Sequence, residues 1–171
     1  DSLLEAALTN GESNIILANR KGRAIRFHED DVRDMGRNTS GVKGMDLGDD
    51  NELVDMVVIK NTHGATVLAI SENGYGKRSL VEDYREQSRG GKGVITLKVT
   101  KKTGELIALK DVSDKDDLMV ITEGGKVIRM SCDGIRTMGR NTQGVRIMRL
   151  DTEGKIAAVT RVVNEEEDET V

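Results

Sequence analysis

The chain has 171 residues, of which 36% are hydrophobic, 33% charged and 2% aromatic, and its formal net charge is −4. This length suits one domain with a shared core, and no apolar run approaches the roughly 20 residues that span a bilayer. The single cysteine, Cys132, excludes an intrachain disulfide, and so few aromatic side chains argue against recognition of unpaired bases by stacking.

The charge is unevenly distributed along the chain. Residues 151–171 contain seven acidic and two basic residues, so this segment is −5 and residues 1–150 are +1. The stretch 71–110 has nine basic and five acidic residues, or +4. We therefore expect a basic body followed by an acidic disordered tail at 164–171. Because the first residue is Asp1 and not Met, we also expect the chain to be a piece of a longer one.

Three units of about 50 residues repeat along the chain. Two sets of residues share intervals of 52 and 51: Gly22, Gly74 and Gly125, and Arg37, Arg89 and Arg140. Met-Gly-Arg-Asn-Thr occurs at both 35–39 and 138–142. A period of this length is typical of propeller blades or arrays.

Each unit begins with a pattern of two strands. Short apolar runs stand at 15–18, 67–70 and 118–121, and four such residues suit a strand that is buried on both faces. A glycine turn follows, and the next segment alternates Arg or Lys with apolar residues at 23–27 and 126–130. The middle copy, at 75–79, departs from this alternation.

A polar loop of about a dozen residues precedes two further strands in every unit. The third strands begin at Gly41, Gly93 and Gly144, and the fourth cover 53–59, 106–112 and 156–162. The sequence thus predicts an all-β, propeller-like array of about three four-stranded blades, each completed by its own unit. The expected blade units are approximately 9–60, 61–112 and 113–163, with 1–8 as the last strand of a preceding blade.

The most distinctive loop is Arg89-Gly90-Gly91-Lys92-Gly93. Adjacent glycines allow backbone N–H groups to converge on an anion in a nest, and the two basic side chains add charge. Arg37 and Arg140 end the equivalent loops, and a row of arginines with polar donors suits phosphate groups. The alternative is a set of glycine turns with solvated charges.

No combination of nucleophile, base and orienting residue emerges, so we expect no catalytic site. His28 and His63 lack partner cysteines, and the Asp-rich turns do not follow calcium-loop spacing. We accordingly expect neither a metal nor a cofactor.

At residues 87–93 the sequence Gln-Ser-Arg-Gly-Gly-Lys-Gly resembles the gyrase A box of the C-terminal DNA-wrapping domain of the DNA gyrase A subunit. Ser88 stands where that family's box has Arg, which suggests an imperfect copy of the box. Segments 74–78, 93–98 and 138–145 resemble the same family, so the likeness covers nearly the whole chain.

The resemblance implies a partial β-pinwheel over residues 1–163 that binds and bends duplex DNA, independently of sequence, to support negative supercoiling. It implies an accessory domain of a cytoplasmic, nucleoid-associated type II topoisomerase, whose catalytic residues lie outside this chain. Its partners would be DNA, the gyrase B subunit and the rest of the gyrase A subunit, with no membrane. The DNA-binding residues implied are Gln87, Arg89, Gly90, Gly91, Lys92, Gly93, Arg37, Arg140, Lys77 and Arg78.

Two alternatives remain open at this point. The chain could be the corresponding domain of the topoisomerase IV A subunit, although that family lacks a clear box. It could also be a protein-interaction propeller, against which the scarcity of aromatic anchors argues.

The acidic tail could compete with DNA for the basic rim, or it could be a passive solubilising end.

Overall fold

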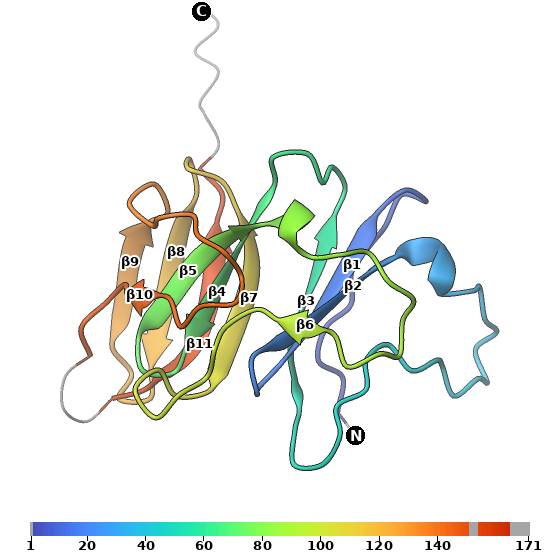
Figure 1. Cartoon of the computed structure of the whole chain (residues 1–171), viewed down its shortest axis with the longest axis horizontal. Coiled ribbons are helices and arrows are strands. Elements are labelled where there is room, and N and C mark those ends of the chain that lie inside the picture. The colour runs from blue at the N-terminus through green and yellow to red at the C-terminus, as the bar shows by residue number, and fades with distance from the viewer. Residues whose placement is uncertain (1, 151–153, 165–171) are drawn as a thin grey trace, which may run out of the picture.

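The computed structural model describes residues 2–150 and 154–164, which form three antiparallel β-sheets arranged side by side (Figure 1). The all-β prediction is confirmed. In this part of the chain the only helical segments are two single 3-10 turns, η1 (Glu29–Asp31) and η2 (Val81–Asp83). None of the described helices is long and apolar enough to cross a membrane. The predicted acidic tail lies outside the described residues, except for Asn164.

Each unit supplies the first, second and fourth strands that its pattern predicts. In the first sheet these are β1 (Asn14–Asn19), β2 (Arg23–His28) and β3 (Leu53–Ile59). In the second they are β4 (Thr66–Ser71), β5 (Tyr75–Leu80) and β7 (Leu106–Val112). In the third they are β8 (Asp117–Thr122), β9 (Val127–Ser131) and β11 (Ile156–Val162). The first strand of each unit lies between the other two.

The short third strands cross to the neighbouring sheet. Strand β6 (Val94–Ile95) comes from the second unit but pairs with β2 of the first, in the order β3-β1-β2-β6. Strand β10 (Val145–Arg146) of the third unit likewise pairs with β5, in the order β10-β5-β4-β7. The expectation that every unit completes its own blade is therefore wrong, because the long loop carries the third strand across to the preceding sheet.

Two expected strands are absent from the described residues. Residues 2–13 and 32–52 contain no strand, and Leu3 and Leu8 are 86% and 94% exposed. The reason is the same in both places: neither segment pairs with a described strand in the hydrogen-bonded ladder that a strand requires. The third sheet, in the order β11-β8-β9, has three described strands and ends on β9, where Val127 is exposed.

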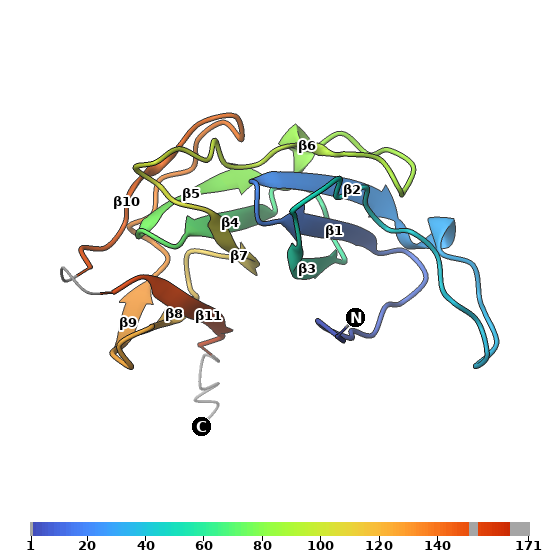
Figure 2. The ribbon, with the colours of Figure 1, turned by 90° about the horizontal axis from the view of Figure 1, so that it is seen from below.

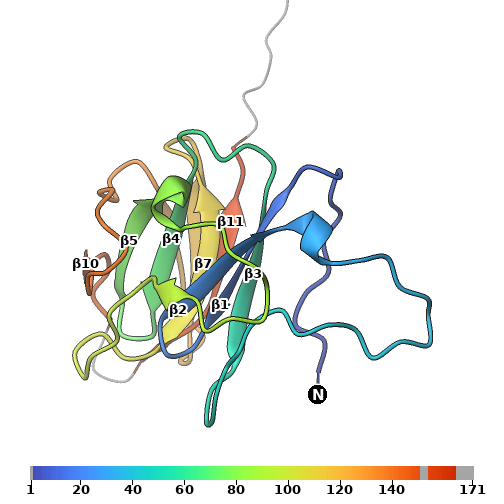
Figure 3. The same ribbon diagram turned by 45° about the vertical axis from the view of Figure 1, so that its right-hand side comes forward.

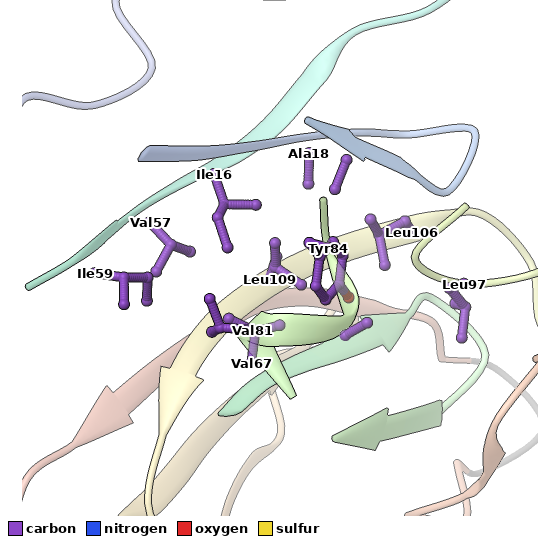
Figure 4. Packing of buried hydrophobic residues seen from close by; sticks show 12 residues of the cluster. Ile16, Ala18, Val57, Ile59, Val67, Val81, Tyr84, Leu97, Leu106 and Leu109 are labelled. Atoms are coloured by element: carbon purple, nitrogen blue, oxygen red, sulfur yellow. The ribbon is translucent and has the colours of Figure 1, made fainter. Parts of the chain in front are cut away.

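Two of the three described hydrophobic clusters lie between neighbouring sheets. One cluster joins the first and second sheets and includes Ile16, Val67, Tyr84 and Leu109 (Figure 4). A second cluster joins the second and third sheets and includes Leu68. Alternate residues of β4 thus enter different clusters, which explains why its sequence is continuously apolar. Burying each large aliphatic side chain contributes about 1.5–3 kcal/mol.

The three sheets form an arc, with an inner and an outer side (Figure 2). Strands β3, β7 and β11 are neighbours on the inner side, where the N-terminal segment also lies. The segments that carry β6 and β10 run along the outer side. In the first unit the loop that follows η1 extends away from the sheets (Figure 3).

Candidate nucleic-acid interface

Two segments on the outer side of the arc concentrate the positive charge. Residues 85–102 contain six basic residues and one acidic residue, and residues 136–149 contain four basic residues and none that is acidic. Their net charges are +5 and +4, which leaves −13 on the rest of a chain whose total is −4. Because these segments carry β6 and β10, they occupy equivalent places on successive sheets. Such a strip attracts a polyanion.

The repeated glycines at 93 and 144 are required by the strand exchange. Gly93 has φ +69° and Gly144 has φ +72°. A Cβ atom on Gly93 would lie 2.3 Å from the carbonyl oxygen of Ala24, and one on Gly144 would lie 2.5 Å from that of Gly76. Both glycines therefore permit close approach to the preceding sheet, a role that the sequence analysis did not anticipate.

The backbone N–H groups of the expected anion-binding nest around Gly90 and Gly91 are largely engaged in hydrogen bonds within the chain. The N–H of Gly90 donates to the carbonyl of Gly44 at 2.6 Å, and the carbonyl of Gly91 accepts from the N–H of Asp46 at 2.9 Å. The N–H of Arg89 points to the Asp31 carboxylate at 3.4 Å. This turn is thus tied to the loop of the first unit, and two of its N–H groups are not available to an anion.

The guanidinium of Arg89 also reaches back to the first unit. Its Nε donates to the carbonyl of Asp31 at 2.8 Å, and its Nη1 donates to the carbonyl of Lys43 at 3.1 Å. Arg140 repeats this arrangement one unit later, donating to the carbonyls of Asp83 and Ile95, both at 3.0 Å. Both side chains are half-buried.

Arg37, the first member of this row, is in a different environment. It is exposed in the loop that follows η1 and makes no side-chain hydrogen bond or ion pair with any described residue. The shared spacing of Arg37, Arg89 and Arg140 therefore brings the second and third into equivalent contacts but leaves the first in solvent.

Lys77, which the resemblance placed on the DNA-binding surface, is buried. Its Nζ donates to the carbonyl of Gly139 at 2.8 Å, to that of Arg140, and to the hydroxyl of Thr142 at 3.1 Å. Burial, together with the nearby charge of Arg140, lowers the pKa of Lys77 to about 8. The buried ammonium of Lys77 thus binds three oxygen atoms of the third unit's loop and fixes that loop on β5.

Arg78 is buried as well and belongs to a second row of inter-unit contacts. It donates to the Thr66 hydroxyl at 2.9 Å, to the carbonyl of Cys132 at 3.4 Å, and pairs with the Asp114 carboxylate. Arg26, at the equivalent place in the first sheet, donates to the carbonyls of Val81 and Tyr84 at 3.3 and 3.1 Å. Arg26 is not among the predicted interface residues, although its spacing of 52 from Arg78 is visible in the sequence.

The remaining predicted residues, Gln87 and Lys92, flank the glycines. The N–H of Gln87 donates to the carbonyl of Arg26 at 2.9 Å, and its buried Nε2 makes no hydrogen bond with the described residues. The Lys92 side chain is exposed, and its carbonyl accepts from Nε of Arg23 at 3.1 Å. Lys92 is therefore presented to solvent by a turn whose backbone is fixed.

Exposed basic residues that the sequence analysis missed lie in the same segments. Lys98 and Arg149 are exposed, and each stands five residues after a repeated glycine. Arg146 packs on the Tyr75 ring at 5.4 Å and donates to its hydroxyl at 3.0 Å. A third aligned set is formed by Arg33, Arg85 and Arg136, again spaced by 52 and 51. Comparing offsets between units would have revealed these positions.

Comparison with known proteins gives a consistent result. The model of the family described as DNA gyrase C-terminal domain, beta-propeller, matches residues 13–60, 65–113 and 116–162. The DNA gyrase A subunit of Staphylococcus aureus is 38% identical over 170 residues, which is 99% of this chain and 19% of the relative. The DNA gyrase A subunit of Haloquadratum walsbyi is 39% identical over 159 residues, which is 93% of this chain and 19% of the relative. The chain thus spans about one fifth of the curated relatives it matches.

Solved structures share the architecture. A DNA gyrase A C-terminal domain matches with a TM-score of 0.79 and 28% identity over 89% of this chain and 51% of that chain. The C-terminal domain of a DNA topoisomerase IV matches with a TM-score of 0.84 and 23% identity over 92% of this chain and 49% of that one. At that identity the second likeness shows the fold alone.

Proposed function

This chain belongs to the DNA gyrase C-terminal domain, beta-propeller, family, and from that premise we propose that it binds duplex DNA along its outer loops and bends it around the arc. The single observation that carries the proposal is the strip of basic loops at +5 and +4, repeated on successive sheets of a chain whose net charge is −4. Phosphate contacts of this kind position a duplex without reading its sequence.

The predicted residues divide by exposure. Arg37 and Lys92 have exposed side chains and are proposed to contact phosphates directly. Gly90, Gly91 and Gly93 hold the loop on the first sheet, and Gln87 enters that loop through its hydrogen bond to Arg26. Lys77 and Arg78 are proposed to position the loop of the third unit rather than to touch DNA.

In the complete protein this domain would act as an accessory to strand passage. We propose that it is part of a gyrase A subunit in the cytoplasm and works with the gyrase B subunit. Wrapping would present a DNA segment with fixed handedness to catalytic residues elsewhere in the enzyme. The corresponding domain of topoisomerase IV is the second candidate, and the identity of 38% to gyrase A over 99% of the chain favours gyrase. A protein-interaction propeller has no comparable support.

The binding test is fluorescence anisotropy with duplexes of unrelated sequence at several salt concentrations. We expect similar affinities for all sequences, and a plot of log K against log salt that steepens by about 0.9 for every phosphate neutralised. Single strands of equal length are the control, because the surface has few aromatic residues for stacking. Affinity that is independent of salt, or confined to one sequence, would contradict the proposal.

The wrapping test is topological. Nicked circular DNA is sealed by ligase with and without saturating protein, and the topoisomers are then separated on a gel. We expect a shift of one sign that grows with bound protein, because a handed path around the arc changes the linking number. If the protein binds DNA but produces no such shift, the proposed DNA binding stands and the proposed wrapping is wrong.

A further inference from the structure

Two aligned rows of arginine have the same spacing but different surroundings. Arg89 and Arg140 are half-buried and donate to four backbone carbonyls of the preceding units. Arg85 and Arg136, four residues earlier in each unit, are exposed and make no side-chain hydrogen bond or ion pair with any described residue. The repeat therefore contains one arginine with its donors engaged and one with its donors free.

The exposed arginines are held in place by their neighbours. Tyr84, which precedes Arg85, is 1% exposed, and Glu86, which follows it, bridges to Arg26 of the first sheet. Ile135 and Thr137 flank Arg136 in the same way, because Ile135 is 5% exposed and Thr137 bridges to Arg78. Each exposed guanidinium thus projects from a fixed backbone, once per sheet.

We infer that Arg85 and Arg136, with Arg33 as the first member of the row, contact phosphate groups of the bound duplex, one arginine from each unit, whereas Arg89 and Arg140 are positioning residues that set the angle between units. This inference rests on the proposed function. It assigns the affinity for DNA to Arg85 and Arg136, and the curvature of the bound DNA to Arg89 and Arg140. Free arginine donors suit phosphate oxygens, while a guanidinium that already bridges two carbonyls resists movement of the two loops it joins.

The first arm of the test measures affinity. Replacing both Arg85 and Arg136 with Gln removes two contacts and is expected to flatten the log K against log salt slope by about 1.8. Replacing both with Lys keeps the charge and is expected to preserve most of the slope. Lys60→Gln with Lys155→Gln, on exposed residues that border the inner strands β3 and β11, removes the same charge as a control and should leave the slope unchanged.

The second arm measures curvature at saturating protein, so that loss of affinity does not interfere. A duplex of about 40 base pairs, well below the persistence length of ~150 base pairs, carries a donor and an acceptor dye at its ends. Arg89→Lys with Arg140→Lys keeps both charges, but an ammonium group lacks the planar fork that joins two carbonyls. We expect energy transfer to fall toward that of free DNA, while the salt slope changes by less than about 0.5.

The third arm is a measurement without DNA, and it tests the positioning role of Arg89 independently of the other two arms. Hydrogen exchange at the amide of Gly90, which donates to Gly44, should be at least tenfold faster in Arg89→Lys than in the parent and unchanged in Arg85→Gln. Failure of the parent to bind duplex would overturn the proposed function. If the parent binds, an unchanged slope in the Arg85 and Arg136 Gln variant, or unchanged energy transfer in the Arg89 and Arg140 Lys variant, overturns this inference.

Discussion

Lys110 and Asp55 form an ion pair across the inner strands β7 and β3, with 3.0 Å between Nζ and Oδ2. The Asp55 side chain is 6% exposed and also accepts a hydrogen bond from the N–H of Leu109 at 3.0 Å. The next pair of inner strands is joined similarly, since Arg161 on β11 lies 2.6 Å from the carboxylate of Asp111 on β7. The inner side of the arc is thus crossed by ionic contacts, while the outer side is joined by arginines and exchanged strands.

Asp55→Ala is expected to destabilise the chain by about 3 kcal/mol, because it leaves the largely buried ammonium of Lys110 without its partner. The free energy of unfolding from urea titrations measures this. Asp111→Ala is the matched control, with an expected cost below about 1 kcal/mol, because the Asp111 side chain is 43% exposed and Arg161 keeps Asp116 at 3.0 Å. Equal costs for the two variants would contradict the assignment.

Lys77 predicts a pH dependence of stability. Its pKa is lowered to about 8 from its ordinary value of 10.5, first by burial and second by the charge of Arg140. Between these two values the unfolded chain binds more protons at Lys77 than the folded chain does, so this residue's contribution to stability rises with pH. Urea titrations of the parent and of Lys77→Met at pH 7 and pH 10 should show the parent gaining relative to the variant. A constant difference would indicate that the pKa is not lowered.

Gly93→Ala is expected to cost at least about 2 kcal/mol, because it combines a positive φ with a Cβ that overlaps the carbonyl of Ala24. Gly91→Ala, in the same turn, is the control. Its Cβ would lie 3.5 Å from Cδ1 of Ile25, an ordinary contact, and its φ is not positive. Thermal unfolding should therefore separate two alanine substitutions that stand two residues apart. Similar melting temperatures would show that the sheet tolerates displacement of β6.

Tyr84→Phe tests a buried hydroxyl pair. The Tyr84 hydroxyl bonds to the Thr96 hydroxyl, and both residues are almost fully buried, at 1% and 0% exposure. Removing one hydroxyl leaves the other without this partner, which is expected to cost about 1–3 kcal/mol. Combining Tyr84→Phe with Thr96→Val should restore part of the loss in urea titrations, since both polar groups are then gone. A double variant less stable than the sum of the single ones would count against this pairing.

The sequence was sufficient for the strands whose pattern is set by burial. The run at 67–70 was expected to be buried on both faces, and Val67 and Leu68 do enter different clusters. The partner of a third strand could not be predicted, because two residues such as Val94 and Ile95 carry no pattern that distinguishes their own sheet from the preceding one. Strand β6 pairs with β2 because the long loop carries it to the preceding sheet and because Gly93 permits close approach to Ala24.

For the interface, the repeat identified the correct segments but not the role of each residue. Equal spacing places Arg89 and Arg140 at equivalent points, yet spacing is the same for a side chain in solvent and for one that joins two carbonyls. The middle copy at 75–79 lost its alternation because Lys77 is covered by the loop of the third unit. That covering is a tertiary contact, and its only trace in the sequence was the broken pattern.

The exchange of β6 also sets an order for folding during synthesis. The edge of β2 at Arg23 remains open until Ile95 has been made, 72 residues later. At translation rates of about 5–20 residues per second, that edge waits roughly 4–14 seconds. A ribosome that pauses between the second and third units would similarly hold β5 without β10. Each nascent sheet is thus exposed to pairing with other chains for as long as its successor takes to emerge.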